Sequence, residues 1–233
     1  MDPVELLMSF NLTRQEATIY MTLFVEGDLT GYEVAKLTGI SRSNIYTSLA
    51  GLVDKGAAYI IEGTATRYTS VPVEEFCDNR IRQLKGTQQE IIKHMPAKKE
   101  EAEGYITIKG QKHILDKMKN MIIEAKERVY LSVSSNTLEA ILDELRDGLE
   151  RGLKIVIITN EPFQLSGAAV YHAEKPQHQI RLIVDSSNVL TGDMTEGDNS
   201  TCLYSKKKNL VDLLKDSIKN EMRLINIMKG MVN

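Results

Sequence analysis

The stretch from Ser41 to Ser48 holds the side chains best suited to read a nucleic acid. Arg42 and Asn44 belong to the residue types that form paired hydrogen bonds with guanine and adenine edges. Hydroxyl side chains beside them suit contacts with phosphate oxygens, namely Ser41, Ser43, Tyr46 and Thr47. Ile45 and Leu49 are interleaved at helical spacing, which predicts a helix with one buried and one polar face. Because any solvated helix shows a polar face, the residue types alone do not separate these two interpretations.

Three helices are predicted to position this stretch. The sequences Thr13-x-x-Glu16 and Thr30-x-x-Glu33 have the form of a capping box, in which a hydroxyl and a carboxylate bond the free amides at a helix start. Ser41 is expected to cap the third helix. Helical spacing assigns further residues to the buried faces of these helices, among them Phe24, Tyr32 and Leu37.

A two-stranded hairpin is predicted directly after the third helix. The pattern becomes that of strands at residues 58–61 and 66–71, with a turn between them that holds Thr64. Three helices followed by a hairpin is the order of a winged helix-turn-helix, which we expect to span residues 1–72. In that fold the third helix lies in the major groove of double-stranded DNA. Thr64 and Arg67 on the hairpin would then reach the DNA backbone or the minor groove.

The charge of this region argues in part against a nucleic-acid partner. Residues 1–72 hold five Lys or Arg and eight Asp or Glu residues, a net charge of −3. A domain with this balance is expected to make few phosphate contacts and to bind non-specific DNA weakly. The alternative is a winged helix that serves as a protein–protein interaction module without a DNA role.

A long charged helix is predicted for residues 73–103. Six residues on it alternate at spacings of four and three, the pattern of a coiled-coil seam, namely Cys77, Ile81, Leu84, Gln88, Ile91 and Met95. Pro96 predicts that the helix ends near His94 or kinks there. This segment is interpreted as a dimerising linker, so that the chain itself is the expected partner. The alternative is a solitary amphipathic helix packed on a domain.

From residue 104 to 233 strand and helix patterns alternate, which predicts a three-layer α/β domain. The chain as a whole is therefore expected to combine an α+β winged helix with an α/β domain. Ligands of parallel sheets bind beyond the carboxyl ends of strands, which makes Ser134, Asn136 and Asn160 pocket candidates. The same residue types are also ordinary turn residues and helix caps. Residues 162–179 have no assigned structure.

Four motifs in the first third of the chain resemble those of the TrmB-type transcriptional regulators. They are Leu12–Tyr20, Leu29–Ala35, Ile40–Tyr46 and Leu52–Gly56. The resemblance implies a homodimer that binds DNA and responds to a small-molecule effector, a sugar or another metabolite, through its C-terminal part. Long members of the family carry an additional sugar-binding region after the α/β domain, which we do not expect in this chain.

The α/β domain of that family resembles phospholipase D-like domains, whose catalytic motif is His-x-Lys, four residues and Asp. His178, Ile180 and Asp185 have this spacing, with isoleucine in place of the lysine, and Asp193 stands where such an enzyme has serine. Isoleucine cannot stabilise phosphoryl charge, and Asp193 would repel it. The motif is therefore interpreted as a catalytic relic. His178, Asp185 and Asp193 either line a vestigial effector pocket or are ordinary strand and turn residues.

The composition limits the remaining classes. The first ten residues have no basic segment of a secretory signal, and no apolar run reaches the roughly 18 residues of a membrane span. Cys77 and Cys202 are too far apart in sequence for a zinc knuckle and are taken as reduced thiols. We expect a cytoplasmic protein without membrane, cofactor or metal partners. The alternative functions are a phospholipase D-like phosphodiesterase and the interaction module.

Overall fold

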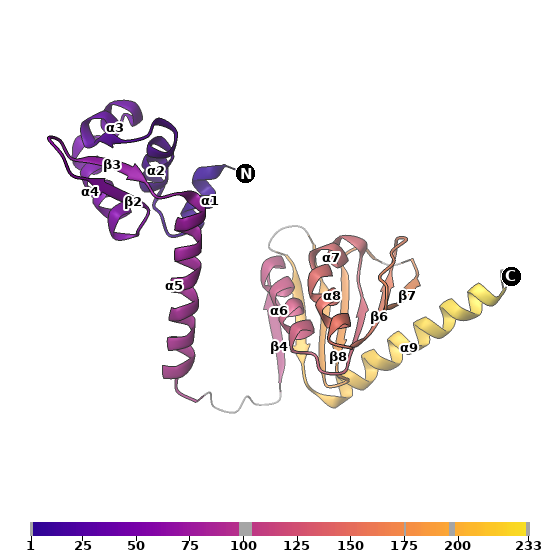
Figure 1. The fold of residues 1–233 in the computed structure, drawn as a ribbon. Coiled ribbons are helices and arrows are strands. Elements are labelled where there is room, and N and C mark those ends of the chain that lie inside the picture. The colour runs from indigo at the N-terminus through magenta and orange to yellow at the C-terminus, as the bar shows by residue number, and fades with distance from the viewer. Residues whose placement is uncertain (1, 98–103, 175, 196–198, 232–233) are drawn as a thin grey trace. The chain divides into compact units, whose positions relative to one another are not determined.

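The computed structural model describes residues 2–97, 104–174, 176–195 and 199–231 (Figure 1). The chain divides into two compact units, Met1–Ala97 and Lys98–Asn233. Each unit buries its own hydrophobic core. Among the described residues, no helix is long and apolar enough to cross a membrane.

The N-terminal unit contains the predicted three helices and hairpin, and two further elements that the sequence analysis missed. Its elements are α1 (Pro3–Ser9), α2 (Arg14–Glu26), β1 (Leu29–Thr30), α3 (Gly31–Thr38), α4 (Arg42–Asp54), β2 (Ala58–Ile61), β3 (Arg67–Ser70) and α5 (Val73–His94). The sheet is antiparallel with the order β1-β3-β2, so the hairpin has a third strand. The missed elements are α1 and the two-residue β1, which are too short to show a period.

Both predicted capping boxes are confirmed. At the start of α2 the Thr13 amide donates to Glu16 Oε2 over 2.6 Å, and the Glu16 amide donates to Thr13 Oγ1 over 3.2 Å. The start of α3 shows the same exchange between Thr30 and Glu33. Ser41 is the N-cap residue of α4, as predicted, but its side chain makes no capping hydrogen bond. Its backbone carbonyl accepts the first helical bond instead, and the exposed side chain faces solvent.

A partly buried ion pair joins α2 to the C-cap residue of α4. Glu16 is 6% exposed, and Lys55 donates to its Oε2 over 2.6 Å. Burial alone would raise the pKa of Glu16, but the hydrogen bonds from Lys55 and Thr13 outweigh it and hold the pKa below its usual value. Glu16 Oε1 also occupies the space that a side chain at Gly51 would need, so glycine at that position lets the two helices approach. These contacts, with the fully buried Ile45, fix the orientation of α4.

Three predicted buried residues lie outside the core. Phe24, Tyr32 and Leu37 are each more than half exposed. In α3 the core contact is narrow, because Val34 is the buried large side chain of this eight-residue helix. Helical spacing therefore predicted an apolar face wider than the one that packs.

The helix α5 leaves most of its surface uncovered by the rest of the N-terminal unit. Phe76 in its first turn is buried, whereas Ile81, Leu84 and Ile91 of the predicted seam are 42–55% exposed. The helix ends at His94, and Met95 is extended, as expected for a residue that precedes proline. This end agrees with one of the two alternatives predicted from Pro96, and residues 98–103 of the predicted segment lie outside the described part of the chain.

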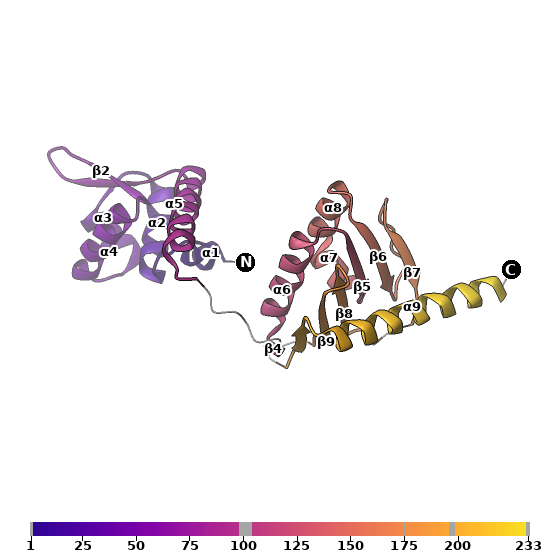
Figure 2. The same ribbon diagram turned by 90° about the horizontal axis from the view of Figure 1, so that it is seen from below.

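The C-terminal unit is a mixed sheet between two helical layers, which confirms the predicted three-layer α/β architecture (Figures 1 and 2). The sheet order is β4-β10-β9-β8-β5-β6-β7, and the pairs among β5, β6 and β7 are parallel while the others are antiparallel. Its strands are β4 (Tyr105–Lys109), β5 (Arg128–Ser132), β6 (Lys154–Thr159), β7 (Ala169–His172), β8 (Gln179–Val184), β9 (Asn188–Asp193) and β10 (Thr201–Ser205).

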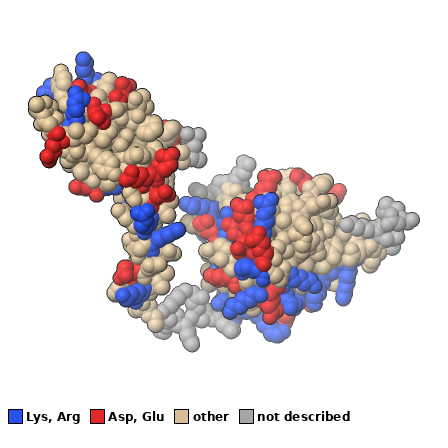
Figure 3. Space-filling model, in the orientation of Figure 1, with Lys and Arg blue, Asp and Glu red and all other residues tan. Residues whose placement is uncertain are grey.

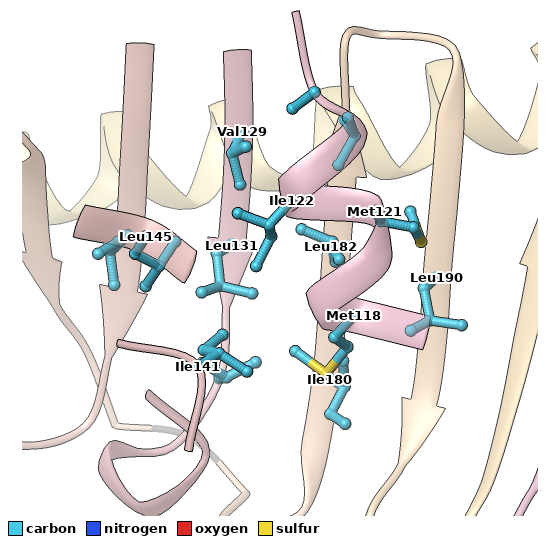
Figure 4. Close-up of a cluster of buried hydrophobic side chains, with 14 of the residues drawn as sticks. Met118, Met121, Ile122, Val129, Leu131, Ile141, Leu145, Ile180, Leu182 and Leu190 are labelled. Carbon is cyan, nitrogen blue, oxygen red and sulfur yellow. The ribbon is translucent and has the colours of Figure 1, made fainter. Parts of the chain in front are cut away.

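The two faces of this sheet have separate cores. The helices α6 (Gln111–Glu124), α7 (Ser135–Ala140) and α8 (Leu142–Glu150) cover one face, where side chains such as Met118, Leu131 and Leu182 pack together (Figure 4). The helix α9 (Lys208–Met231) covers the other face through Val211, Leu214 and Ile218.

Two local predictions for this unit are corrected. The single helix predicted over 138–151 is interrupted at Ile141, which ends α7 and precedes α8. Leu138, Ile141 and Leu145 all face the same core, so the apolar period continues through the break and hides it. The unassigned segment 162–179 contains β7, which pairs in parallel with β6.

Candidate nucleic-acid interface and polar pocket

The predicted reading residues lie together on the outer face of α4. The side chains at positions 41–44, 46 and 47 are exposed, while Ile45 and Ser48 are buried. The Thr47 hydroxyl is already engaged, because it donates to the Ser43 carbonyl over 3.1 Å. The remaining exposed groups include one guanidinium and one carboxamide, from Arg42 and Asn44. This face can therefore offer paired hydrogen bonds to base edges from a helix that is fixed to the core.

Two of these side chains lie against the start of α3. The Arg42 guanidinium carbon is 4.7 Å from the ring centroid of Tyr32. The ring of Tyr46 covers Gly31 so closely that a Cβ there would lie 2.6 Å from Tyr46 Cε1. The first turn of α3 thus supports the first turns of α4.

The predicted wing residues have different surroundings. Arg67 is folded back on its own unit, since its Nη1 donates to the Asp28 carbonyl over 2.6 Å and lies 3.5 Å from Glu33 Oε2. Hydrogen bonds from Thr30, and to a lesser extent the charge of Arg67, hold the pKa of Glu33 below its usual value. Thr64 is exposed in the turn between β2 and β3. Arg67 in this arrangement braces α3 and does not extend toward a ligand.

Basic side chains do not dominate this unit. Figure 3 shows acidic and basic groups interspersed over the visible face of the N-terminal unit. The surface agrees with the net charge of −3 for residues 1–72. Few phosphate contacts are available, so any sequence preference would depend on contacts with base edges.

The C-terminal unit has a polar cavity of about 220 Å³ at one edge of its sheet. Because β5 and β6 are parallel and β8 is antiparallel to β5, the ends of β5 and β6 meet the start of β8 at this edge. Four of the six predicted pocket residues line it, namely Ser134, Asn136, Asn160 and His178. Six further polar residues line it, namely Ser135 and Glu161 beside the same strand ends, and Gln111, Thr137, Gln177 and Thr195.

Internal hydrogen bonds hold part of this lining. The Ser134 and Thr137 hydroxyls lie 3.2 Å apart, and Asn160 Oδ1 accepts from the Ser135 amide over 3.2 Å. The Thr195 hydroxyl oxygen is buried and has no hydrogen-bond partner among the residues that the structure describes. Among its described residues the lining offers neutral donors and acceptors, and Glu161 carries a charge of fixed sign.

Asp185 and Asp193 do not line this cavity, contrary to the prediction. Asp185 lies at the far end of β8, where its carboxylate accepts from the amides of Lys126, Glu127 and Arg128 over 2.8–2.9 Å. Burial opposes its ionisation, but these three donors outweigh burial and hold the pKa of Asp185 below its usual value. It lines a separate cavity of about 410 Å³. Asp193 ends β9 as an exposed residue, one position before the lining begins at Met194.

Ile180, at the position of the lysine in the predicted motif, lies in the core of the C-terminal unit. Ile180 is 1% exposed and belongs to the core beneath α6, near Met118 (Figure 4). His178 lies two residues earlier and is exposed at the rim of the cavity. A lysine at position 180 would place an ammonium group among aliphatic side chains. Among the residues that the structure describes, no three His, Cys, Asp or Glu side chains gather closely enough to hold a metal ion.

Comparison with known proteins assigns both units. Residues 6–74 match the family described as sugar-specific transcriptional regulator TrmB, and residues 104–218 match the N-terminal subdomain of the TrmB effector-binding domain, EBD. The chain is 29% identical over 237 residues to the uncharacterized protein YrhO of Bacillus subtilis, covering 97% of this chain and 86% of YrhO.

Two further proteins are similar over a shorter stretch or at lower identity. The HTH-type sugar sensing transcriptional regulator TrmBL1 of Pyrococcus furiosus is 29% identical over 164 residues, which cover 67% of this chain and 46% of TrmBL1. Among solved structures, the archaeal chromatin protein TrmBL2 is similar at 20% identity and a TM-score of 0.47, with 95% of this chain and 97% of that chain covered.

Proposed function

This chain belongs to the TrmB family of transcriptional regulators, and we propose that it reads specific sequences in double-stranded DNA through the exposed face of α4. The observation that carries the proposal is the arrangement of Arg42 and Asn44. Both are exposed on a helix whose opposite face is fully buried and which an ion pair ties to α2. A helix so anchored can present these side chains to a major groove in a fixed register.

The functional unit in this proposal is a homodimer formed through α5. The uncovered stripe of Ile81, Leu84 and Ile91 has the seam spacing of a coiled coil, and burial against a second copy would remove it from water. We expect Leu84→Glu to convert the dimer to a monomer in sedimentation equilibrium, because it places a charge in the seam. Lys85→Glu, at an exposed position beside the seam, is the control and is expected to leave the dimer intact.

The polar cavity at the end of β5 and β6 is the proposed effector site. Its lining of hydroxyl, carboxamide and imidazole groups suits a sugar or another polar metabolite, in agreement with the family's description as sugar-specific. Occupancy of the cavity would alter the affinity for DNA. We do not expect phosphodiesterase activity, because Ile180 is buried where a catalytic lysine would be needed. Turnover of bis-p-nitrophenyl phosphate that is lost in His178→Ala would contradict this.

Selection of bound sequences from random duplex DNA tests the DNA proposal. The wild-type protein is expected to enrich a palindromic site, because a dimer presents two recognition helices. Arg42→Ala and Asn44→Ala should each relax the preference at one position of the half-site, by a factor of roughly ten. Lys36→Ala removes an exposed basic residue from α3 and is expected to keep the selected sequence. No enrichment at low salt would favour the protein–protein module instead.

A further inference from the structure

Tyr32 is an exposed aromatic residue with one conspicuous neighbour. Its side chain is 55% exposed on α3, although an apolar ring of this size gains most from burial. The Arg42 guanidinium lies over the ring, 4.7 Å from its centroid, which is within the range of a cation–π contact. The exposed ring is therefore covered in part by the first residue of the recognition helix.

We propose that Tyr32 is a positioning residue for DNA reading, which holds the Arg42 guanidinium in the orientation that recognises a guanine. This inference rests on the proposed function. An arginine on a helix surface has four rotatable side-chain bonds, and ordering them on binding costs free energy. A ring that already restrains the guanidinium reduces this cost and fixes the direction of its paired donors. The expected gain is sequence discrimination at the base pair that Arg42 reads.

The platform under Tyr32 is itself braced. The capping box fixes the first turn of α3, with Glu33 Oε2 accepting from the Thr30 amide over 2.7 Å and from its hydroxyl over 2.9 Å. Arg67 adds a hydrogen bond to the Asp28 carbonyl and an ion pair with Glu33. Glu33 Oε2 therefore interacts both with Thr30 at the start of its own helix and with Arg67 of the hairpin.

A second contact from the same turn fixes the next turn of α4. The Tyr46 ring lies against Gly31, where any side chain would collide with it. Arg42 and Tyr46 are four residues apart and lie on one face of the helix. Gly31 and Tyr32 therefore support two exposed side chains of the recognition helix, Tyr46 and Arg42.

The test compares base preference in variants of the full-length protein, with the duplex that the wild type enriches from a random library as the probe. The base pair read by Arg42 is identified as the one at which the Arg42→Ala variant no longer prefers one base over the others. At that position Tyr32→Leu is expected to lower the preference about two- to fivefold. Tyr32→Phe keeps the ring and should retain the preference. Leu37→Ala, at a residue of α3 that is 54% exposed, is the matched control and should also retain it.

A double-mutant cycle separates positioning from a general structural role. In the Arg42→Ala background, Tyr32→Leu should have no further effect on base preference, because the group that it positions is gone. Equal weakening of all sequences by Tyr32→Leu would indicate a structural role and overturn the inference. Loss of preference in Tyr32→Phe would do the same, since it would assign the effect to the hydroxyl. No enriched sequence for the wild type would overturn the proposed function and the inference together, whereas an enriched sequence that Tyr32→Leu reads equally well overturns the inference alone.

Discussion

The two units assemble their candidate sites in different ways. In the N-terminal unit six proposed reading side chains come from the stretch 41–47 at the start of one helix, and supporting contacts come from Gly31 and Tyr32. In the C-terminal unit the cavity is built from the start of α6, the segments after β5 and β6, the start of β8 and the end of β9. A site on one helix depends on local structure, whereas a site between strand ends depends on the order of the whole sheet.

A related contrast concerns two acidic residues, Glu16 and Asp185. Each accepts hydrogen bonds from a distant segment, Glu16 from Lys55 on α4 and Asp185 from the amides that precede β5. Glu16 positions α4, the proposed reading helix, whereas Asp185 ties the β8–β9 turn to the sheet away from the polar cavity. If the units have separate roles, changes at each acidic residue should affect its own unit only.

The largest effect is expected for Glu16→Ala. The substitution leaves Lys55 without its carboxylate, removes half of the capping box and opens a space beside Gly51. We expect the N-terminal unit to lose about 3 kcal/mol of unfolding free energy. Hydrogen exchange measured on peptides of α2 and α4 would report the loss, and peptides of the C-terminal sheet should be unchanged. Glu26→Ala, at an exposed position of the same helix, is the control. A uniform loss across both units would mean that they do not act separately.

A smaller effect is expected for Gly192→Ala in the C-terminal sheet. A Cβ at this position would collide with the Thr201 carbonyl oxygen and lie 2.6 Å from Cys202 Cα, both in the backbone of β10. We expect a loss of about 2 kcal/mol, limited to the C-terminal unit. Gly86→Ala is the control, because Gly86 lies in α5 with open space around it and should gain about 0.5–1 kcal/mol from better helix propensity. An equal response at the two positions would contradict the packing argument.

The smallest effect is expected for Asp185→Asn and depends on pH. The folded pKa of Asp185 lies below its usual value of 3.8, so its contribution to stability is fully present above that pH and is lost as the pH falls through the lower folded value. Asparagine keeps one acceptor oxygen, so the cost at pH 7 should be about 1–2 kcal/mol. Urea unfolding at pH 7 and pH 3 should show that the unfolding free energy falls less on acidification in the variant than in the wild type. An equal loss would mean that this carboxylate is not the titrating group.

The extent to which each region could be predicted follows from the same contrast. Both capping boxes and the outer face of α4 are set by neighbours in sequence, and those predictions were confirmed by the structure. One cavity contains Ser134, Asn136, Asn160 and His178, because strand ends meet at one edge, and the role of this cavity as an effector site stays a prediction. Asp185 does not line it, because β8 carries that residue to the opposite edge of the sheet, which favours the alternative of a turn residue.

Some features had no local signal at all. Gln111 reaches the cavity because β4 pairs with β10 at one side of the sheet, an arrangement that no local period indicates. Tyr32 has the helical spacing of a core residue, and its exposure follows from the narrow contact of α3 with the core. The pairing of α5 with a second copy stays a prediction, since its seam is exposed within its own unit and the structure describes one chain.

The most direct test of the central claim is protein footprinting with hydroxyl radicals, with and without the duplex selected by the wild type. Tyr46 on α4 is 53% exposed and Tyr105 on β4 is 50% exposed, so the two rings start with nearly equal access to solvent. The account predicts that bound DNA slows the oxidation of Tyr46 several-fold and leaves Tyr105 unchanged. Protection of Tyr105 with Tyr46 still reactive would place the DNA on the C-terminal unit and contradict the assignment of α4 as the reading helix.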